Sequence, residues 1–254
     1  MELLFEHYFN IYLRLGEEMS LKIQNNTPIT LSNMDIKVSE LLEAVENTNK
    51  IFEKITTQTR LMDLNIFEIL DFRNFSGVIG ETFASELSKV NAKLIKNRNP
   101  DGYPDLIQVS TLEMEDYHKT ITAKELIKYK YGGVEIKNTF GTKEGYLLMG
   151  HQRIKKINRK LDWKAHHQQT NNLIGLLSDY INDMPQIVAL CYSDELNTDD
   201  WGKVQKPKPG STMTSFSTIG RSGCNKMYEG IRICIDNPSY LEFFGLKGDD
   251  QSGV

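Results

Sequence analysis

Long apolar runs, a secretion signal and clustered cysteines are all missing from this 254-residue sequence. Without a run of roughly eighteen apolar residues, no segment is expected to span a membrane. The N-terminus has no basic stretch followed by a cleavage site, so secretion is not expected. The three cysteines are too widely spaced for a zinc site and are expected to be reduced, largely buried thiols of a cytoplasmic protein: Cys191, Cys224 and Cys234.

An excess of positive charge is also missing. The 30 Lys and Arg residues are outnumbered by 34 Asp and Glu residues, giving a net charge of −4. That balance at first argues against a nucleic-acid partner, but the position of the charges matters more than their sum. An apolar content of 39% and a charged content of 25% are typical of a globular domain, and the length suits one α/β domain or a catalytic core with additions.

The first informative segment is Asn99–Val109. It contains Pro104-Asp105 followed at once by apolar, β-prone residues, so Asp105 is placed where a strand would present it. A rival Pro-Asp pair precedes it, but Asp101-Gly102 is a tight-turn signal. We therefore expect Asp101 at the tip of a hairpin and Asp105 at the start of a strand.

The second segment is Gly132–Asn138, a short strand-like run with Glu135 and Lys137 on either side of Ile136. Side chains two positions apart on a strand point to the same face, so Glu135 and Lys137 are expected to project together. If the two strands are neighbours, Asp105 joins them in a pocket with two carboxylates and one ammonium. Carboxylate oxygens are the ligands that Mg²⁺ prefers.

A Pro-Asp pair, a gap of about thirty residues and a Glu-x-Lys triplet resemble the motif of the PD-(D/E)xK nuclease superfamily, and within it the type II restriction endonucleases. The resemblance covers roughly residues 75–245 and implies an α/β fold, with a restriction-endonuclease-like mixed β-sheet core flanked by helices. It implies that Asp105, Glu135 and the carbonyl of Ile136 bind Mg²⁺, and that Lys137 orients or activates the attacking water. The alternative is that these are solvated residues of an edge strand and a turn.

A helix predicted over residues 75–91 supplies the remaining acidic candidate. Gly77 to Glu81 matches the Gly-x-x-x-Glu pattern that precedes the Pro-Asp strand in the superfamily, which implies that Glu81 completes the acidic cluster or a second metal site. Glu86 lies nearer the middle of the apolar stripe, where an unpaired acid is costly. The resemblance favours Glu81, and Glu86 stays open as the alternative.

The N-terminal segment, residues 1–62, is expected to be an α-helical arm or subdomain, with helices over 2–24 and 39–57; residues 63–254 would form the nuclease core with its DNA-recognition loops. Further along, apolar periodicity and flanking turn signals predict a short helix near 123–129, a helix from His166 through Tyr180, strands at 185–193 and 231–236, a loop over 201–227 and a helix over 240–246. Strand 185–193 is expected to run parallel to the Glu135 strand.

Two basic segments follow the catalytic strand and are candidates to bind DNA. Residues 150–164 contain six Lys and Arg residues and one Asp. Residues 201–227 contain Lys and Arg residues among glycine, serine and threonine. Such side chains reach phosphates and base edges. The candidate DNA-binding residues are Arg153, Lys155, Lys156, Lys164, Lys206, Lys208, Ser211, Thr212, Thr214 and Arg221.

The resemblance predicts a Mg²⁺-dependent type II restriction endonuclease that cuts double-stranded DNA, with a cognate DNA methyltransferase acting on the same site. A palindromic site is most simply matched by a homodimer. Three alternatives remain: a structure-specific or nicking nuclease of the same superfamily, a DNA-binding protein with a vestigial site, and an interaction protein whose motif is accidental.

Overall fold

The computed structural model describes residues 20–70, 72–140, 161, 163–165, 170–181, 184–206 and 215–246. They form a mixed α/β fold around a seven-stranded sheet in the order β1-β11-β9-β8-β6-β5-β4. The strands are β1 (Leu21–Ile23), β11 (Ile231–Ile235), β9 (Met184–Ser193), β8 (Leu173–Ile181), β6 (Gly133–Thr139), β5 (Leu106–Gln108) and β4 (Leu94–Lys96). Neighbours run antiparallel except β6 and β8, which are parallel.

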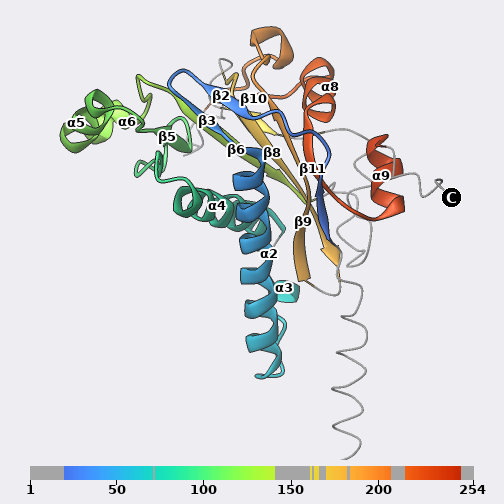
Figure 1. Ribbon diagram of the computed structural model, residues 1–254. Coiled ribbons are helices and arrows are strands. Elements are labelled where there is room, and N and C mark those ends of the chain that lie inside the picture. The colour runs from blue at the N-terminus through green and yellow to red at the C-terminus, as the bar shows by residue number, and fades with distance from the viewer. Residues whose placement is uncertain are drawn as a thin grey trace, which may run out of the picture.

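Helices cover both faces of this sheet (Figure 1). On one face lie α2 (Val38–Arg60), α3 (Ile66–Ile69) and α4 (Phe72–Val90), whose apolar side chains share a core with the even-numbered positions of β6 and β8. On the other lie α8 (Arg221–Glu229) and α9 (Pro238–Phe244), which pack against β8, β9 and β11. None of the described helices is long and apolar enough to cross a membrane.

Helix α2 forms where the apolar stripe predicted one. Leu41, Val45 and Phe52 recur at helical spacing and are buried, as the stripe requires. The Lys37 N–H donates to Glu40 Oε2 (2.8 Å), which satisfies a free donor where the helix begins. The helix therefore contributes its apolar face to the same core as the central sheet.

Helix α2 contacts the sheet beside an irregularity in the β8–β9 pairing. The register shifts between Leu177 and Ser178, and opposite this shift the Asn49 side chain bonds both backbone groups of Ile187: Nδ2 donates to the carbonyl (3.1 Å) and Oδ1 accepts from the N–H (2.8 Å). Asn49 thus joins α2 to the backbone of β9 beside this shift.

Replacing Asn49 with alanine is expected to lower the free energy of unfolding by about 1–3 kcal/mol, because two backbone groups of a packed strand lose their partners. Chemical denaturation would measure the change. Asn47→Ala, on the same helix and similarly half-buried, is the matched control and should be nearly neutral. Equal effects of the two substitutions would contradict this role for Asn49.

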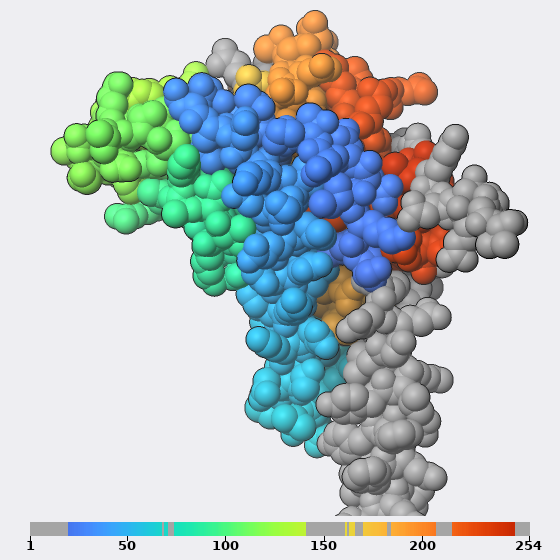
Figure 2. Space-filling model, in the orientation of Figure 1, coloured from blue at the N-terminus to red at the C-terminus, as the bar shows by residue number. Residues whose placement is uncertain are grey.

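Between β5 and β6 the chain leaves the sheet and forms a small lobe, which projects on the β4 side of the molecule (Figures 1 and 2). It contains α5 (Leu112–Thr120) and α6 (Ala123–Leu126), and a cluster of buried apolar side chains, among them Met114, Leu126 and Tyr129, fixes it to β5. Only the second of these helices was predicted. The described residues also form two small antiparallel sheets of two strands each: β2 (Ile29–Leu31) with β3 (Met34–Ile36), and β7 (Lys164–Ala165) with β10 (Ser217–Thr218).

The predicted helix through Leu173 and Tyr180 is wrong, because this segment is strand β8. Every position of β8 is buried, so its nearly continuous apolar run fits helical spacing as well as a strand covered on both faces. Consequently the parallel partner of the Glu135 strand is β8, whereas segment 184–193 pairs antiparallel with β8. The beginning of the predicted helix, at His166, lies outside the described residues.

The helix predicted over 2–24 is also wrong where the structure describes it, since Leu21–Ile23 form an edge strand paired with β11. The rest of that prediction lies outside the described residues. The described part of segment 1–62 shares one hydrophobic core with the sheet. Within the loop predicted at 201–227, residues Arg221–Glu229 form helix α8, which buries Cys224 and Met227.

Candidate functional site

The candidate site lies where strands β5 and β6 separate. Their pairing has only two registered positions, Leu106 with Val134 and Ile107 with Gly133. Asp105 is the residue immediately beyond this ladder, and its Oδ2 accepts the N–H of Ile136 (2.7 Å). The Asp105 carboxylate therefore takes the place of a backbone carbonyl as the partner of the Ile136 N–H. Ile136 lies between Glu135 and Lys137, so Asp105 is held beside both.

Asp105 and Glu135 repel each other electrostatically. The pKa of Asp105 is raised to about 7, first by burial and then by the neighbouring Glu135 carboxylate. The Lys137 ammonium and the Ile136 N–H oppose this rise but do not cancel it. A carboxyl that holds its proton near neutral pH, beside a second acid, is characteristic of a site arranged to bind or react rather than to stabilise the fold.

Glu135 and Lys137 project from the same face of β6, as their spacing predicted, and form an ion pair with Nζ and Oε1 2.5 Å apart. The other carboxylate oxygen, Glu135 Oε2, is buried and has no hydrogen-bond partner among the described residues. An anionic oxygen buried in this way is costly unless a ligand meets it.

Lys137 is a cation in this setting. Burial by itself would lower its pKa, but Glu135 and Asp105 outweigh burial and raise the pKa above the usual lysine value. The ammonium is therefore protonated at neutral pH. It can stabilise negative charge or orient a water molecule, but it is not a ready general base.

Glu81 reaches the site from α4, on the opposite face of β6 from Glu135 and Lys137. Its carboxylate raises the pKa of Asp105, although less than Glu135 does, and it is ion-paired with Lys96 at the end of β4. The rival acid, Glu86, is buried, and its Oε1 pairs with Lys89 Nζ (2.5 Å). Glu86 does not line the cavity that Glu81 and Asp105 share.

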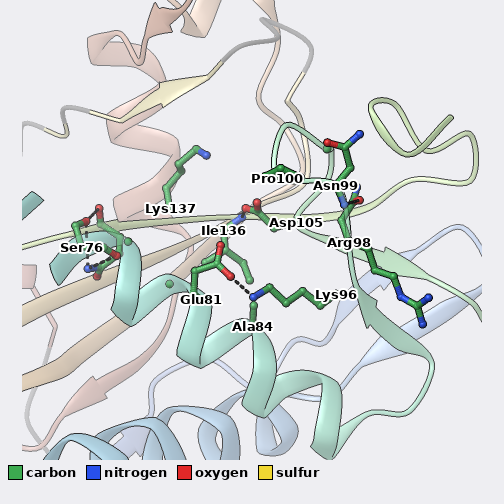
Figure 3. A pocket seen from close by; sticks show the side chains of 15 residues that line it. Ser76, Glu81, Ala84, Lys96, Arg98, Asn99, Pro100, Asp105, Ile136 and Lys137 are labelled. Atoms are coloured by element: carbon green, nitrogen blue, oxygen red, sulfur yellow. Dashed lines mark hydrogen bonds and ion pairs between the residues drawn. The ribbon is translucent and has the colours of Figure 1, made fainter. Parts of the chain in front are cut away.

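That cavity has a volume of about 510 Å³ and lies between α4, the β4–β5 loop and β6. Figure 3 shows Glu81 directed at Lys96, Asp105 at the Ile136 backbone, and Lys137 on the other side of β6 from Lys96. Charged groups of both signs thus meet around an open space that can admit a charged substrate.

The residues that support the site were not singled out from the sequence. Ser76 Oγ donates to the Asn138 carbonyl (2.8 Å) and Ser178 Oγ donates to Asn138 Oδ1 (2.8 Å), which joins α4, β6 and β8 beside Lys137. The Tyr103 phenol is hydrogen-bonded to Thr170 and lies near Glu135. Isolated polar residues of this kind carry no sequence signal until the strand order is known.

The oxygens present suit a hard divalent cation. Asp105 and Glu135 supply carboxylates, and the Glu135 N–H donates to Asn172 on the β8 side, so the backbone of the next residue, Ile136, faces Asp105. Its carbonyl would point to the same side as its N–H. Within the described part of the chain no three acidic, histidine or cysteine side chains converge on one point. Asp105, Glu135 and the Ile136 carbonyl could together hold such a cation.

The predicted DNA-binding residues are only partly described. Lys164 lies over the Phe216 ring (4.2 Å), and Lys206 follows Gln205, which pairs with Phe216. Arg221 is exposed in the first turn of α8. The others lie outside the described residues: Arg153, Lys155, Lys156, Lys208, Ser211, Thr212 and Thr214.

Comparisons of the chain with protein-family models, with curated proteins and with solved structures found no match.

Proposed function

We propose that this protein is a Mg²⁺-dependent deoxyribonuclease that hydrolyses phosphodiester bonds of double-stranded DNA at a specific site. The observation that carries the proposal is the meeting of Asp105, Glu135 and Lys137. Thirty residues separate the first two in sequence, yet Asp105 bonds the backbone of Ile136, between the other two. This is the arrangement that the PD-(D/E)xK resemblance requires.

The strand order supports the same reading. Helix α4 leads into the antiparallel strands β4, β5 and β6, and the chain then returns to place β8 parallel to β6. The sheet is thus mixed and flanked by helices, as the resemblance implies. Glu81, Asp105 and Lys137 line one cavity although they come from successive elements, and Glu135 is paired with Lys137 beside it.

Each residue has a role that its environment suits. Asp105 and Glu135 would hold Mg²⁺ together with the Ile136 carbonyl. Mg²⁺ bound there would lower the pKa of a bound water and neutralise charge on the phosphate. Lys137, kept protonated by its two acidic neighbours, would orient the water and stabilise the negative charge that grows on the phosphate. The resemblance implies that Glu81 completes the acidic cluster or a second metal site.

The finer features of the proposal come from the resemblance. We expect a type II restriction endonuclease, acting as a homodimer on a palindromic site and accompanied by a methyltransferase of the same specificity. The exposed Lys164, Lys206 and Arg221 would contact DNA phosphates. The three cysteines are buried and none forms a disulfide within the described residues, which suits a reducing compartment such as the cytoplasm.

The test is incubation of the purified protein with phage DNA in the presence of Mg²⁺ or EDTA. Discrete bands that appear with Mg²⁺ and not with EDTA are expected. A smear would indicate a nuclease without site specificity. Intact DNA with a retarded complex at low salt would support a DNA-binding protein with a vestigial site, and intact DNA without retardation would overturn the proposal.

A further inference from the structure

Lys96 is a charged residue of the cavity for which the proposed reaction gives no role. It is the last residue of β4, and its ammonium is paired with Glu81 of α4 across the cavity that Asp105 and Lys137 also line (Figure 3). The side chains of Lys96 and Glu81 keep 48% and 62% of their surface exposed. The pair therefore stands in solvent at the opening of the site and is not part of the core.

An exposed ion pair of this kind contributes only about 0–1 kcal/mol to stability. The Lys96 ammonium has three N–H donors and is half exposed, so it can stay beside Glu81 and also contact a second anion. A DNA phosphate entering the cavity is such an anion, and lysine binds phosphate as a point charge. Lys137 lies on the other face of β6 (Figure 3), so the two ammonium groups can contact different phosphates of one strand.

The geometry also bears on Glu81. Its carboxylate is already neutralised by Lys96, and within the described residues it does not converge with Asp105 and Glu135 into a three-acid group. Arg98, two residues beyond Lys96, also borders the cavity, but its guanidinium points away from Glu81 and Asp105 (Figure 3). Of Lys96 and Arg98, which both border the cavity, Lys96 is thus the one directed toward Glu81.

We propose that Lys96 binds a DNA phosphate next to the one that is cut, and that Glu81 is a positioning residue that holds Lys96 over the cavity instead of binding the metal. This inference rests on the proposed nuclease function. The resemblance instead makes Glu81 part of the acidic cluster or of a second metal site. The two roles can be told apart because a ligand of Mg²⁺ and a partner of Lys96 respond differently to substitution.

The first experiment measures binding of the intact protein to a labelled duplex of about 30 base pairs in EDTA, at salt concentrations from about 50 to 200 mM. Lys96→Ala is expected to weaken binding and to reduce the slope of log K against log salt by about 0.9, the value for one phosphate contact. Lys93→Ala is the matched control, since Lys93 is exposed on the same hairpin but does not line the cavity. An unchanged slope in Lys96→Ala would overturn the inference.

The second experiment follows cleavage of phage DNA as Mg²⁺ is varied. Glu81→Gln is expected to raise the KM for DNA several-fold, to leave the Mg²⁺ concentration at half-maximal rate unchanged, and to add nothing in the Lys96→Ala background. A tenfold or larger rise in the required Mg²⁺ would instead make Glu81 a metal ligand. Wild-type protein that cuts no DNA would overturn the proposed function itself, whereas active wild type with an unchanged slope in Lys96→Ala overturns only the role of Lys96.

Discussion

Lys137→Ala is expected to slow Mg²⁺-dependent DNA cleavage by about 10²–10³-fold, the usual cost of removing one group that stabilises transition-state charge. Lys137 is the cation paired with Glu135, with Nζ 2.5 Å from Oε1. Its removal should leave DNA binding largely intact, because phosphate contacts elsewhere supply most of the affinity. Single-turnover cleavage and a gel-retardation assay on the same preparation measure the two effects.

Lys93→Ala again serves as the control, because this lysine is exposed and outside the cavity. Its cleavage rate should match wild type. Circular dichroism and the melting temperature of Lys137→Ala establish that the fold is kept. A cleavage rate of Lys137→Ala within about threefold of wild type would show that the ammonium plays no part in the reaction.

Asp105→Asn is expected to abolish cleavage and, in the metal-free protein, to raise stability. The pKa of Asp105 moves from 3.8 to about 7 on folding, through burial and the repulsion of Glu135. The folded state therefore holds the proton more tightly than the unfolded state, so the contribution of Asp105 to stability is greatest below about pH 4 and is lost as the pH rises through 7. Asparagine keeps an oxygen for the Ile136 N–H without the charge.

At pH 8 the variant should be more stable than wild type by about 2–4 kcal/mol, or of the order of 10 °C in melting temperature, and at pH 4.5 the difference should fall to about 1 kcal/mol or less. Thermal unfolding in EDTA at the two pH values measures this. Asp101→Asn, in the exposed turn of the same loop, should show no such dependence. A variant less stable than wild type at pH 8 would mean that the ionised Asp105 carboxylate stabilises the fold.

Much of the site was predictable because its residues lie close together in sequence or follow strand periodicity. Glu135 and Lys137 share a face of β6, and Asp105 immediately precedes β5, close to the strand start expected from the proline, the turn and the apolar run. The fold was predictable only as a mixed α/β class. Strand β8 was mistaken for a helix because burial on both faces removes the alternation that marks a strand.

What the sequence could not indicate depends on tertiary packing. Nothing local distinguishes Lys96 from other lysines, and its pairing with Glu81 follows only from the packing of α4 beside β4. The same holds for Asn49, whose contact with Ile187 joins residues 138 positions apart. The short strand β1 was absorbed into a predicted helix because three residues at a sheet edge carry too little pattern to be separated from a neighbouring apolar stretch.

The most direct test of the central claim is whether Asp105 and Glu135 bind a divalent cation. Titration of the DNA-free protein with Mn²⁺ at pH 8, with free Mn²⁺ followed by electron paramagnetic resonance, measures this without any reaction. We expect at least one ion per chain, with affinity reduced tenfold or more in Asp105→Asn and in Glu135→Gln but not in Asp101→Asn. Equal Mn²⁺ binding by wild type and all three variants would contradict a metal site between β5 and β6.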